Sequence, residues 1–119
     1  MKLRNLMIVV DDCAAAKEYY VNVFGLAVVT EVENNVILTE GLVLQNRSVW
    51  EEVMPSKVIA KNNMTELYFE ENDIKAFTQK LLRLYPDTQM VTPLYEYPWG
   101  KKIVRFYDPF GNLIEVGTR

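Results

Sequence analysis

The sequence predicts an α+β fold made of two βαβββ modules whose sheets enclose a cleft. A strand, a capped amphipathic helix and three further strands follow one another twice along the chain. The two helix caps, Asp12 and Asp73, lie 61 residues apart (73 − 12), and Gly41 and Gly111 take matching places near the module ends. A repeat of this kind is typical of half-domains that cannot bury their apolar faces alone.

The first module is predicted over residues 1–45 and begins with an apolar strand at residues 3–10. Asp11 and Asp12 end this strand and cap a helix that starts at Cys13 and stops before Gly25. Short strands follow at residues 27–33, 36–38 and 42–45, separated by turn residues. The apolar residues of the helix recur at i, i+3, i+4, i+7 and i+8: Ala16, Tyr19, Tyr20, Val23 and Phe24.

The second module is predicted over residues 64–119, after a connection at residues 46–63. In the connection, Ser48 and Glu51 form a capping-box pattern that predicts a short helix over residues 49–54. We interpret the connection as a linker or dimer contact, with a cover over the cleft as the alternative. The elements of the second module are a strand at residues 66–70, a helix from Ile74 that ends at Pro86, and strands at residues 89–97, 102–107 and 112–116.

The composition restricts the chemistry open to this chain. It has 119 residues, a net charge of −3 and no histidine, which excludes Ser–His and Cys–His nucleophile systems and histidine-ligated metal centres. The mild acidity argues against a nucleic-acid partner, and the apolar runs are too short to cross a membrane. With one cysteine and no signal-peptide pattern, the protein is expected in the cytoplasm, and Cys13 is interpreted as an ordinary small residue.

Strand alternation predicts which side chains face the cleft, because residues two apart in a strand share a face. Glu66 and Tyr68 face it from the leading strand of the second module. At the same offset of 61, Asn5 takes the place of Glu66 in the first module (66 − 5). Gln45 aligns with Glu115 near the module ends. The cleft is therefore expected to be lined with carboxylate and amide groups.

Two carboxylates at one cleft repel each other unless a cation, a shared proton or a basic side chain lies between them. Glu66 and Glu115 therefore predict either a hard-cation site, completed by the amide oxygens of Asn5 and Gln45, or a wet pocket for a cationic or hydroxylated ligand. Arg105, expected on the same face, either binds a substrate carboxylate or neutralises the two acids. Aromatic side chains at strand spacing are more often core than ligand contacts, yet four of them offer stacking surface here: Tyr68, Tyr95, Tyr97 and Trp99.

Two stretches carry a family resemblance: the leading strand with its double Asp and the helix that ends before Gly25, and residues 97–117, which read YPWGKKIVRFYDPFGNLIEVG. They resemble the vicinal oxygen chelate superfamily, the glyoxalase, bleomycin-resistance and extradiol-dioxygenase group. The resemblance implies paired βαβββ modules that form a curved mixed sheet around a cleft, and a homodimer. It places the metal-ligand positions of the family at Asn5, Gln45, Glu66 and Glu115, of which only Glu115 has the usual residue type.

The resemblance implies a small-molecule-binding protein of the glyoxalase/bleomycin-resistance type with a degenerate metal site. No cofactor is favoured; the alternative is a divergent metal-dependent lyase or dioxygenase in which Glu66 and Glu115, with Gln45, hold a divalent metal and Glu66 or Glu115 is catalytic. A third interpretation is an interaction module without a ligand, whose cleft is filled by Met7, Trp50 and Tyr68. The expected ligand-binding residues are Asn5, Gln45, Glu66, Tyr68, Trp99, Arg105 and Glu115.

Overall fold

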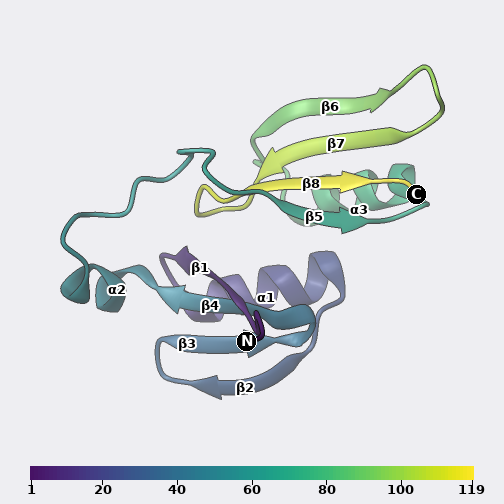
Figure 1. The fold of residues 1–119 in the computed structure, drawn as a ribbon. Helices are drawn as coiled ribbons and strands as arrows, with labels where there is room; N and C mark the ends of the chain where they lie inside the picture. Colours follow the sequence, from purple (N-terminus) through teal and green to yellow (C-terminus); the bar gives the residue numbers. More distant parts are fainter. The chain divides into compact units, whose positions relative to one another are not determined.

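In the computed structural model, which describes residues 1–119, the chain forms two compact units, Met1–Ile59 and Ala60–Arg119 (Figure 1). Each unit holds a four-stranded mixed sheet and one long helix in the order βαβββ. The predicted α+β class and its two βαβββ modules are confirmed. None of the helices combines the length and the apolar character that a membrane-spanning segment needs.

The first unit builds its sheet in the order β1–β4–β3–β2, with β1 and β4 parallel and the other neighbours antiparallel. The helix α1 begins where the Asp12 side chain caps it, at 2.9 Å from the amide nitrogen of Ala14, and ends at Gly25 in the left-handed region with a φ of 71°. The elements are β1 (Leu6–Val10), α1 (Cys13–Phe24), β2 (Val28–Val32), β3 (Asn35–Leu38), a 3₁₀ turn (Thr39–Gly41), β4 (Leu42–Asn46) and α2 (Arg47–Val53).

The second unit repeats this arrangement in the order β5–β8–β7–β6, with β5 and β8 parallel. Asp73 caps α3 through a hydrogen bond that its side chain accepts from the amide of Ala76 at 3.3 Å, and the helix stops just before Pro86. The elements are β5 (Leu67–Glu70), α3 (Ile74–Leu84), β6 (Met90–Glu96), β7 (Lys102–Tyr107) and β8 (Leu113–Gly117).

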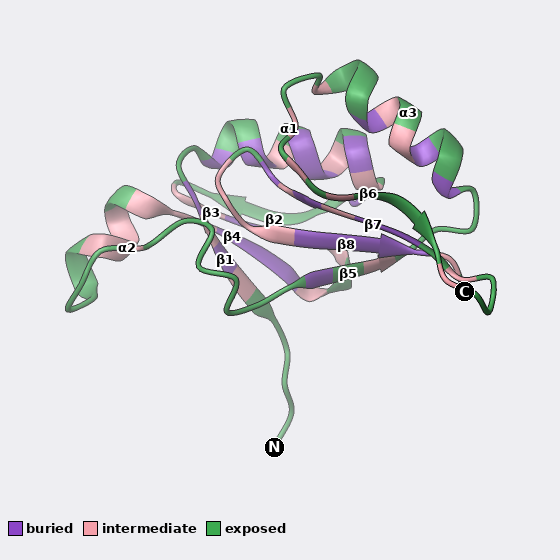
Figure 2. Cartoon of the chain, turned by 90° about the horizontal axis from the view of Figure 1, so that it is seen from above, coloured by how far each residue is buried: buried purple, intermediate pink, exposed green.

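The core of the second unit forms between β7, β8 and α3, whose buried segments are purple in Figure 2. Val104, Phe106 and Ile114 are fully buried, and Phe77 of α3 lies with its ring centroid 6.2 Å from that of Phe106. Burial of such side chains contributes roughly 1.5–3 kcal/mol each. Because Val104, Phe106 and Ile114 take the face toward α3, the residues between them point from the opposite face. These are Ile103, Arg105 and Glu115, of which Ile103 and Glu115 are also buried.

Two details of the predicted elements are wrong. The leading strand begins at Leu6 rather than at residue 3, because its partner β4 begins only at Leu42, after Gly41 has turned with a φ of 75°. The short helix of the connection begins at Arg47, and Ser48 does not cap it. Instead of closing a capping box, the Glu51 carboxylate accepts a hydrogen bond from the amide of Val58 at 2.7 Å.

The turn between β7 and β8 is organised by one buried carboxylate. Asp108, 3% exposed, accepts hydrogen bonds from the amides of Phe110 at 2.9 Å and Asn112 at 2.8 Å, and from the Asn112 side chain at 2.9 Å. Gly111 follows with a φ of 91°, and a Cβ at this residue would lie 2.6 Å from the Cβ of Ala60. The Asp-Pro-x-Gly-Asn sequence thus has a structural role: it forms the turn that directs the chain from β7 into β8.

We predict that Asp108→Ala lowers the free energy of unfolding by about 1–3 kcal/mol, because the turn amides lose their acceptor in a buried position. Asp108→Asn keeps one acceptor oxygen and should lose clearly less. Urea denaturation at neutral pH measures both, with Asp87→Ala as the control, since Asp87 is exposed. A loss for Asp108→Ala of less than about 0.5 kcal/mol, the range of an ordinary surface substitution, would contradict the assignment.

Candidate functional site

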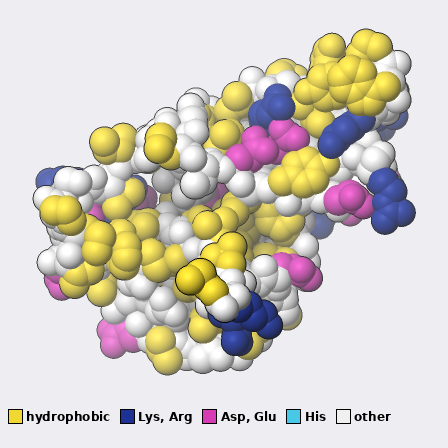
Figure 3. All heavy atoms as spheres, viewed as in Figure 1, with side chains coloured by type: hydrophobic (Ala, Val, Ile, Leu, Met, Phe, Trp, Pro, Cys, Tyr) yellow, Lys and Arg dark blue, Asp and Glu magenta, His cyan; other side chains and the backbone are white.

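The candidate site is built on the face of the second sheet that points away from α3. The sheet register places Arg105 of β7 opposite Glu115 of β8, and Glu115 opposite Tyr68 of β5. Glu66 lies on the same face, two residues before Tyr68 and just ahead of β5. In the view of Figure 3, acidic and basic side chains of this unit adjoin one another on the surface, next to large hydrophobic side chains.

Arg105 lies between two carboxylates. Its Nε is 2.6 Å from Oε1 of Glu115 and 3.8 Å from Oε2 of Glu66, and its Nη1 donates to Oγ1 of Thr92 at 3.4 Å. The Glu115 side chain is 11% exposed, against 32% for Arg105 and 35% for Glu66. Of the two roles predicted for Arg105, the geometry corresponds to neutralisation of the acids, since a carboxylate this deeply buried needs an opposite charge.

The cluster shifts the titration of Glu66. Burial of the Glu66 carboxyl raises its pKa above the ordinary value of 4.5, the negative charge of Glu115 raises the pKa further, and the positive charge of Arg105 lowers it, with a net rise. Desolvation alone would lower the pKa of Arg105, but its hydrogen bond with Tyr97 and the charge of Glu115 outweigh this. The cation of the cluster therefore stays charged, while Glu66 holds its proton to a higher pH than a free glutamate.

A second polar contact crosses the same face. The Lys101 ammonium donates a hydrogen bond to the Tyr68 hydroxyl, which raises the pKa of Lys101, and its Nζ lies 4.9 Å from the centroid of the Tyr68 ring. Gly117 of β8 provides the space for this contact. A Cβ at Gly117 would lie 2.6 Å from the Tyr68 hydroxyl oxygen and 3.2 Å from Cε of Lys101.

Three aromatic rings extend the face toward the β6–β7 turn. Tyr95 and Tyr97 meet edge to face with ring centroids 5.1 Å apart, and Tyr97 stacks on Trp99 at 4.6 Å with an interplanar angle of 10°. Trp99 is 73% exposed and Tyr95 is 49% exposed, so these two rings are surface groups, while Tyr97 is half-buried. They are available for contact with other molecules.

In the first unit, the two predicted positions do not meet. Gln45 lies opposite Val9 of β1, whereas Asn5 lies just before Leu6, the partner of Leu42. The separation of four residues along the strand corresponds to about 13 Å. The side chain of Asn5 lies instead beside Gly41, with Oδ1 3.8 Å from a Cβ placed there.

The carboxamide of Gln45 is already hydrogen-bonded. Its Oε1 accepts from Nδ2 of Asn35 at 2.9 Å, and the two residues are register partners in β3 and β4. This pair corresponds to Arg105 and Glu115 at one common offset of 70 (105 − 35 and 115 − 45). The same cross-strand contact is thus made by two amides in one unit and by an ion pair in the other.

Cys13 lies outside this chemistry. It is buried, and its Sγ lies 3.7 Å from the carbonyl oxygen of Leu44. Burial raises the pKa of its thiol, as do the negative charges of Asp12 and Glu31. A thiolate is therefore disfavoured at neutral pH.

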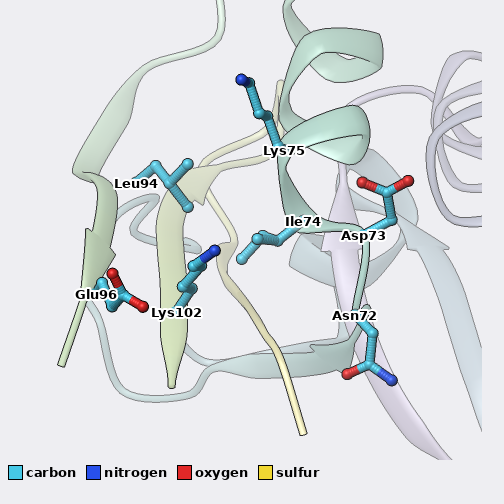
Figure 4. Close-up of a pocket in the computed structure, with 7 residues that line it drawn as sticks. All are labelled: Asn72, Asp73, Ile74, Lys75, Leu94, Glu96 and Lys102. Carbon is cyan, nitrogen blue, oxygen red and sulfur yellow. The ribbon is translucent and has the colours of Figure 1, made fainter. Parts of the chain in front are cut away.

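A separate hollow of about 350 Å³ lies on the α3 side of the second sheet (Figure 4). Ile74 and Leu94 supply apolar lining, and Figure 4 shows the Lys102 side chain pointing into the space between β7 and the start of α3. This hollow shares no residue with the Arg105 cluster. Its lining residues are Asn72, Asp73, Ile74, Lys75, Leu94, Glu96 and Lys102.

Comparison with known proteins identifies the family. The sequence model of the glyoxalase-like domain matches residues 3–119. The chain belongs to the glyoxalase-like domain family. This family lies within the vicinal oxygen chelate superfamily, so the predicted resemblance is confirmed. No curated protein matches the sequence well enough to count as a relative.

Several solved structures share the fold of this glyoxalase-like domain. A protein of unknown function from Agrobacterium tumefaciens strain C58 is 29% identical with a TM-score of 0.82, over 100% of this chain and 94% of that one. A lactoylglutathione lyase from Agrobacterium tumefaciens is 22% identical with a TM-score of 0.71, over 98% and 92%. A glyoxalase/bleomycin resistance protein/dioxygenase from Nocardioides is 18% identical with a TM-score of 0.74, over 99% and 83%. At these last two identities the likeness shows the fold alone.

Sequence reasoning did not assign a role to Lys101 and Gly117 of this face, nor to Asn35 of the first unit. Lys101 lies two residues before Ile103 and four before Arg105, so strand alternation alone could have placed it on the same face. Asn35 and Gly117 carried no comparable signal, because their roles depend on the strand register. No group of three or more His, Cys, Asp and Glu residues is arranged to hold a metal ion.

We predict that the carboxyl of Glu66 makes the folded state less stable as the pH rises. Its folded pKa lies above the unfolded value, so the folded state binds more protons between the two values, and stability falls as pH increases through that window. Glu66→Gln removes this dependence. The wild type should lose stability relative to Glu66→Gln between pH 4 and pH 7, by less than about 1 kcal/mol because the side chain is partly exposed.

Urea denaturation of both proteins across this pH range measures the difference. Glu33→Gln is the matched control, since Glu33 is exposed in the turn between β2 and β3 and makes no ion pair. A wild type that gains stability relative to Glu66→Gln as the pH rises would show that Arg105 outweighs burial and Glu115.

Proposed function

We propose that this glyoxalase-like domain binds a small organic molecule on the polar face of the β5–β8–β7–β6 sheet, without a metal ion. The observation that carries the proposal is the position of Arg105, whose Nε is 2.6 Å from Glu115 and 3.8 Å from Glu66. The guanidinium supplies the positive charge that these two carboxylates require.

The donor groups fit a metal ion poorly. A hard divalent cation takes six or more oxygen ligands, many of them carboxylates or carbonyls with free lone pairs. Oε1 of Glu115 is engaged by Arg105, and Oε1 of Gln45 by Asn35. A divalent cation beside Glu115 would also be repelled by the fixed charge of Arg105. These contacts support a site whose metal function has been lost.

Three partly exposed side chains are suited to contact a ligand on this face. The Tyr68 ring is 47% exposed and offers a stacking surface, Glu66 accepts or donates a hydrogen bond according to its protonation, and Arg105 has N–H groups beyond those directed at the acids. Trp99 extends the surface. Asn5 and Gln45, in the other unit, stay predicted ligand contacts from the sequence.

The proposal is tested by a thermal-shift screen of small aromatic and hydroxylated acids, alcohols and amines, run once with EDTA and once with excess Mn²⁺. We expect stabilising compounds that act equally well under both conditions. Glu66→Gln, Tyr68→Ala and Arg105→Gln should each weaken the best compound about tenfold, which corresponds to about 1.4 kcal/mol, when affinity is measured by calorimetry.

Arg83→Gln is the matched control, because Arg83 is exposed on α3 and makes no ion pair. Elemental analysis of protein purified without chelator addresses the alternative of a metal-dependent lyase or dioxygenase. A stoichiometric metal that disappears in Glu115→Ala, or compounds that act only with Mn²⁺, would favour that alternative over the present proposal.

A further inference from the structure

The turn between β6 and β7 presents an exposed aromatic platform. Trp99 lies with its indole stacked on Tyr97, and Tyr95 supports Tyr97 from the edge. Large aromatic side chains are the main source of burial in protein cores and interfaces, so an indole left 73% exposed is informative. The exposed ring is suited to stack on a partner.

The platform is held in place before any partner arrives. The amide of Tyr97 donates to the carbonyl of Lys101 at 2.8 Å, and the amide of Gly100 donates to the carbonyl of Tyr97 at 2.9 Å. Gly100 completes the turn with a φ of 95°, a conformation that side-chain-bearing residues rarely adopt. A stacked indole on a closed turn loses little conformational freedom on binding, which favours affinity.

Lys101, two residues after Trp99, gives this platform its charge. Its ammonium contacts the hydroxyl and ring of Tyr68 and forms no ion pair with a carboxylate. Arg105, by contrast, is already engaged by Glu115 and Glu66. Lys101 is therefore the cation on this face whose charge no paired carboxylate neutralises.

From these contacts we infer that the Trp99 platform and Lys101 form a subsite for a flat aromatic group that carries an anionic substituent such as a carboxylate. The ring stacks on the indole, and the anion meets the Lys101 ammonium. The inference rests on the proposed function, because it names the ligand class that the same face would take.

Charge placement favours an anion over a cation here. The charge of Lys101 acts on Tyr97, the ring on which Trp99 stacks, so a cationic group bound there would be repelled by a like charge. The carboxylates of this face are already paired with basic side chains: Glu115 and Glu66 with Arg105, and Glu70, whose register partner is Gly117, with Arg119 at 3.4 Å. A ligand cation would have to displace Arg105 or Arg119 from these carboxylates.

The test uses three naphthalene probes that differ only in charge: 2-naphthoate, 2-naphthalenemethanol and 2-naphthylmethylammonium. Calorimetry on the full chain should give the order naphthoate, alcohol, ammonium, with naphthoate at least about fivefold tighter than the alcohol. Lys101→Gln should remove that preference and leave the alcohol unchanged. Trp99→Ala should weaken all three probes, and Trp99→Phe should retain part of the affinity.

Lys57→Gln is the matched control, because Lys57 is an exposed lysine of the first unit. Tighter binding of the ammonium probe, or a naphthoate affinity that Lys101→Gln does not change, would overturn the inference. If no naphthalene probe binds while other compounds bind in a manner sensitive to Arg105→Gln, the inference fails and the proposed function stands. If binding is insensitive to both Arg105→Gln and Trp99→Ala, the proposed function fails as well.

Discussion

The ion pair between Arg105 and Glu115 determines what the second sheet can present on its polar face. A carboxylate whose side chain is 11% exposed costs several kcal/mol to desolvate unless an opposite charge compensates it. The register of β7 and β8 sets Arg105 directly opposite, so the compensation belongs to the antiparallel pairing itself. Glu66 shares the same guanidinium only at 3.8 Å, which explains why burial still raises its pKa in spite of a nearby cation.

The first unit makes the corresponding contact without charge. Asn35 and Gln45 hold the equivalent positions in β3 and β4 and join through one amide hydrogen bond of 2.9 Å. Burying neutral amides that satisfy each other costs far less than burying an ion. The two units therefore keep the position of a cross-strand contact and differ in its electrostatics, so the charged chemistry of this face belongs to the second unit.

The fold could be predicted closely because its signals are local. Caps such as Asp12 and Asp73, the stop at Gly25 and the alternation of apolar residues each depend on a few neighbouring side chains, and the corresponding elements form where they were expected. The errors arose where distant residues compete. Ser48 lost its capping role because Glu51 hydrogen-bonds with Val58, seven residues away, and the leading strand was shortened by where β4 begins.

The candidate site was harder, because it depends on register. Alternation correctly set Glu66 and Tyr68 on one face and Arg105 near Glu115, since period alone decides a face. It could not reveal the register of either parallel pair. Glu115 pairs with Tyr68, two residues after Glu66, whereas Gln45 pairs with Val9, four residues after Asn5, so Asn5 and Gln45 lie apart. Nor could it reveal the contact of Lys101 with Tyr68 over Gly117, which needs three strands in their final alignment.

A guanidinium and a divalent metal ion compensate the same carboxylates in different ways. A metal ion offers open coordination positions, so it gathers ligand oxygens around one point and polarises them. A guanidinium is planar and permanently attached, and it binds only groups that meet its N–H directions. Under the proposed function, ligand recognition by this chain depends on hydrogen-bond direction and ring stacking, and metal chelators do not affect it. Glu66, partly exposed and incompletely neutralised, is then the group through which pH acts on the site.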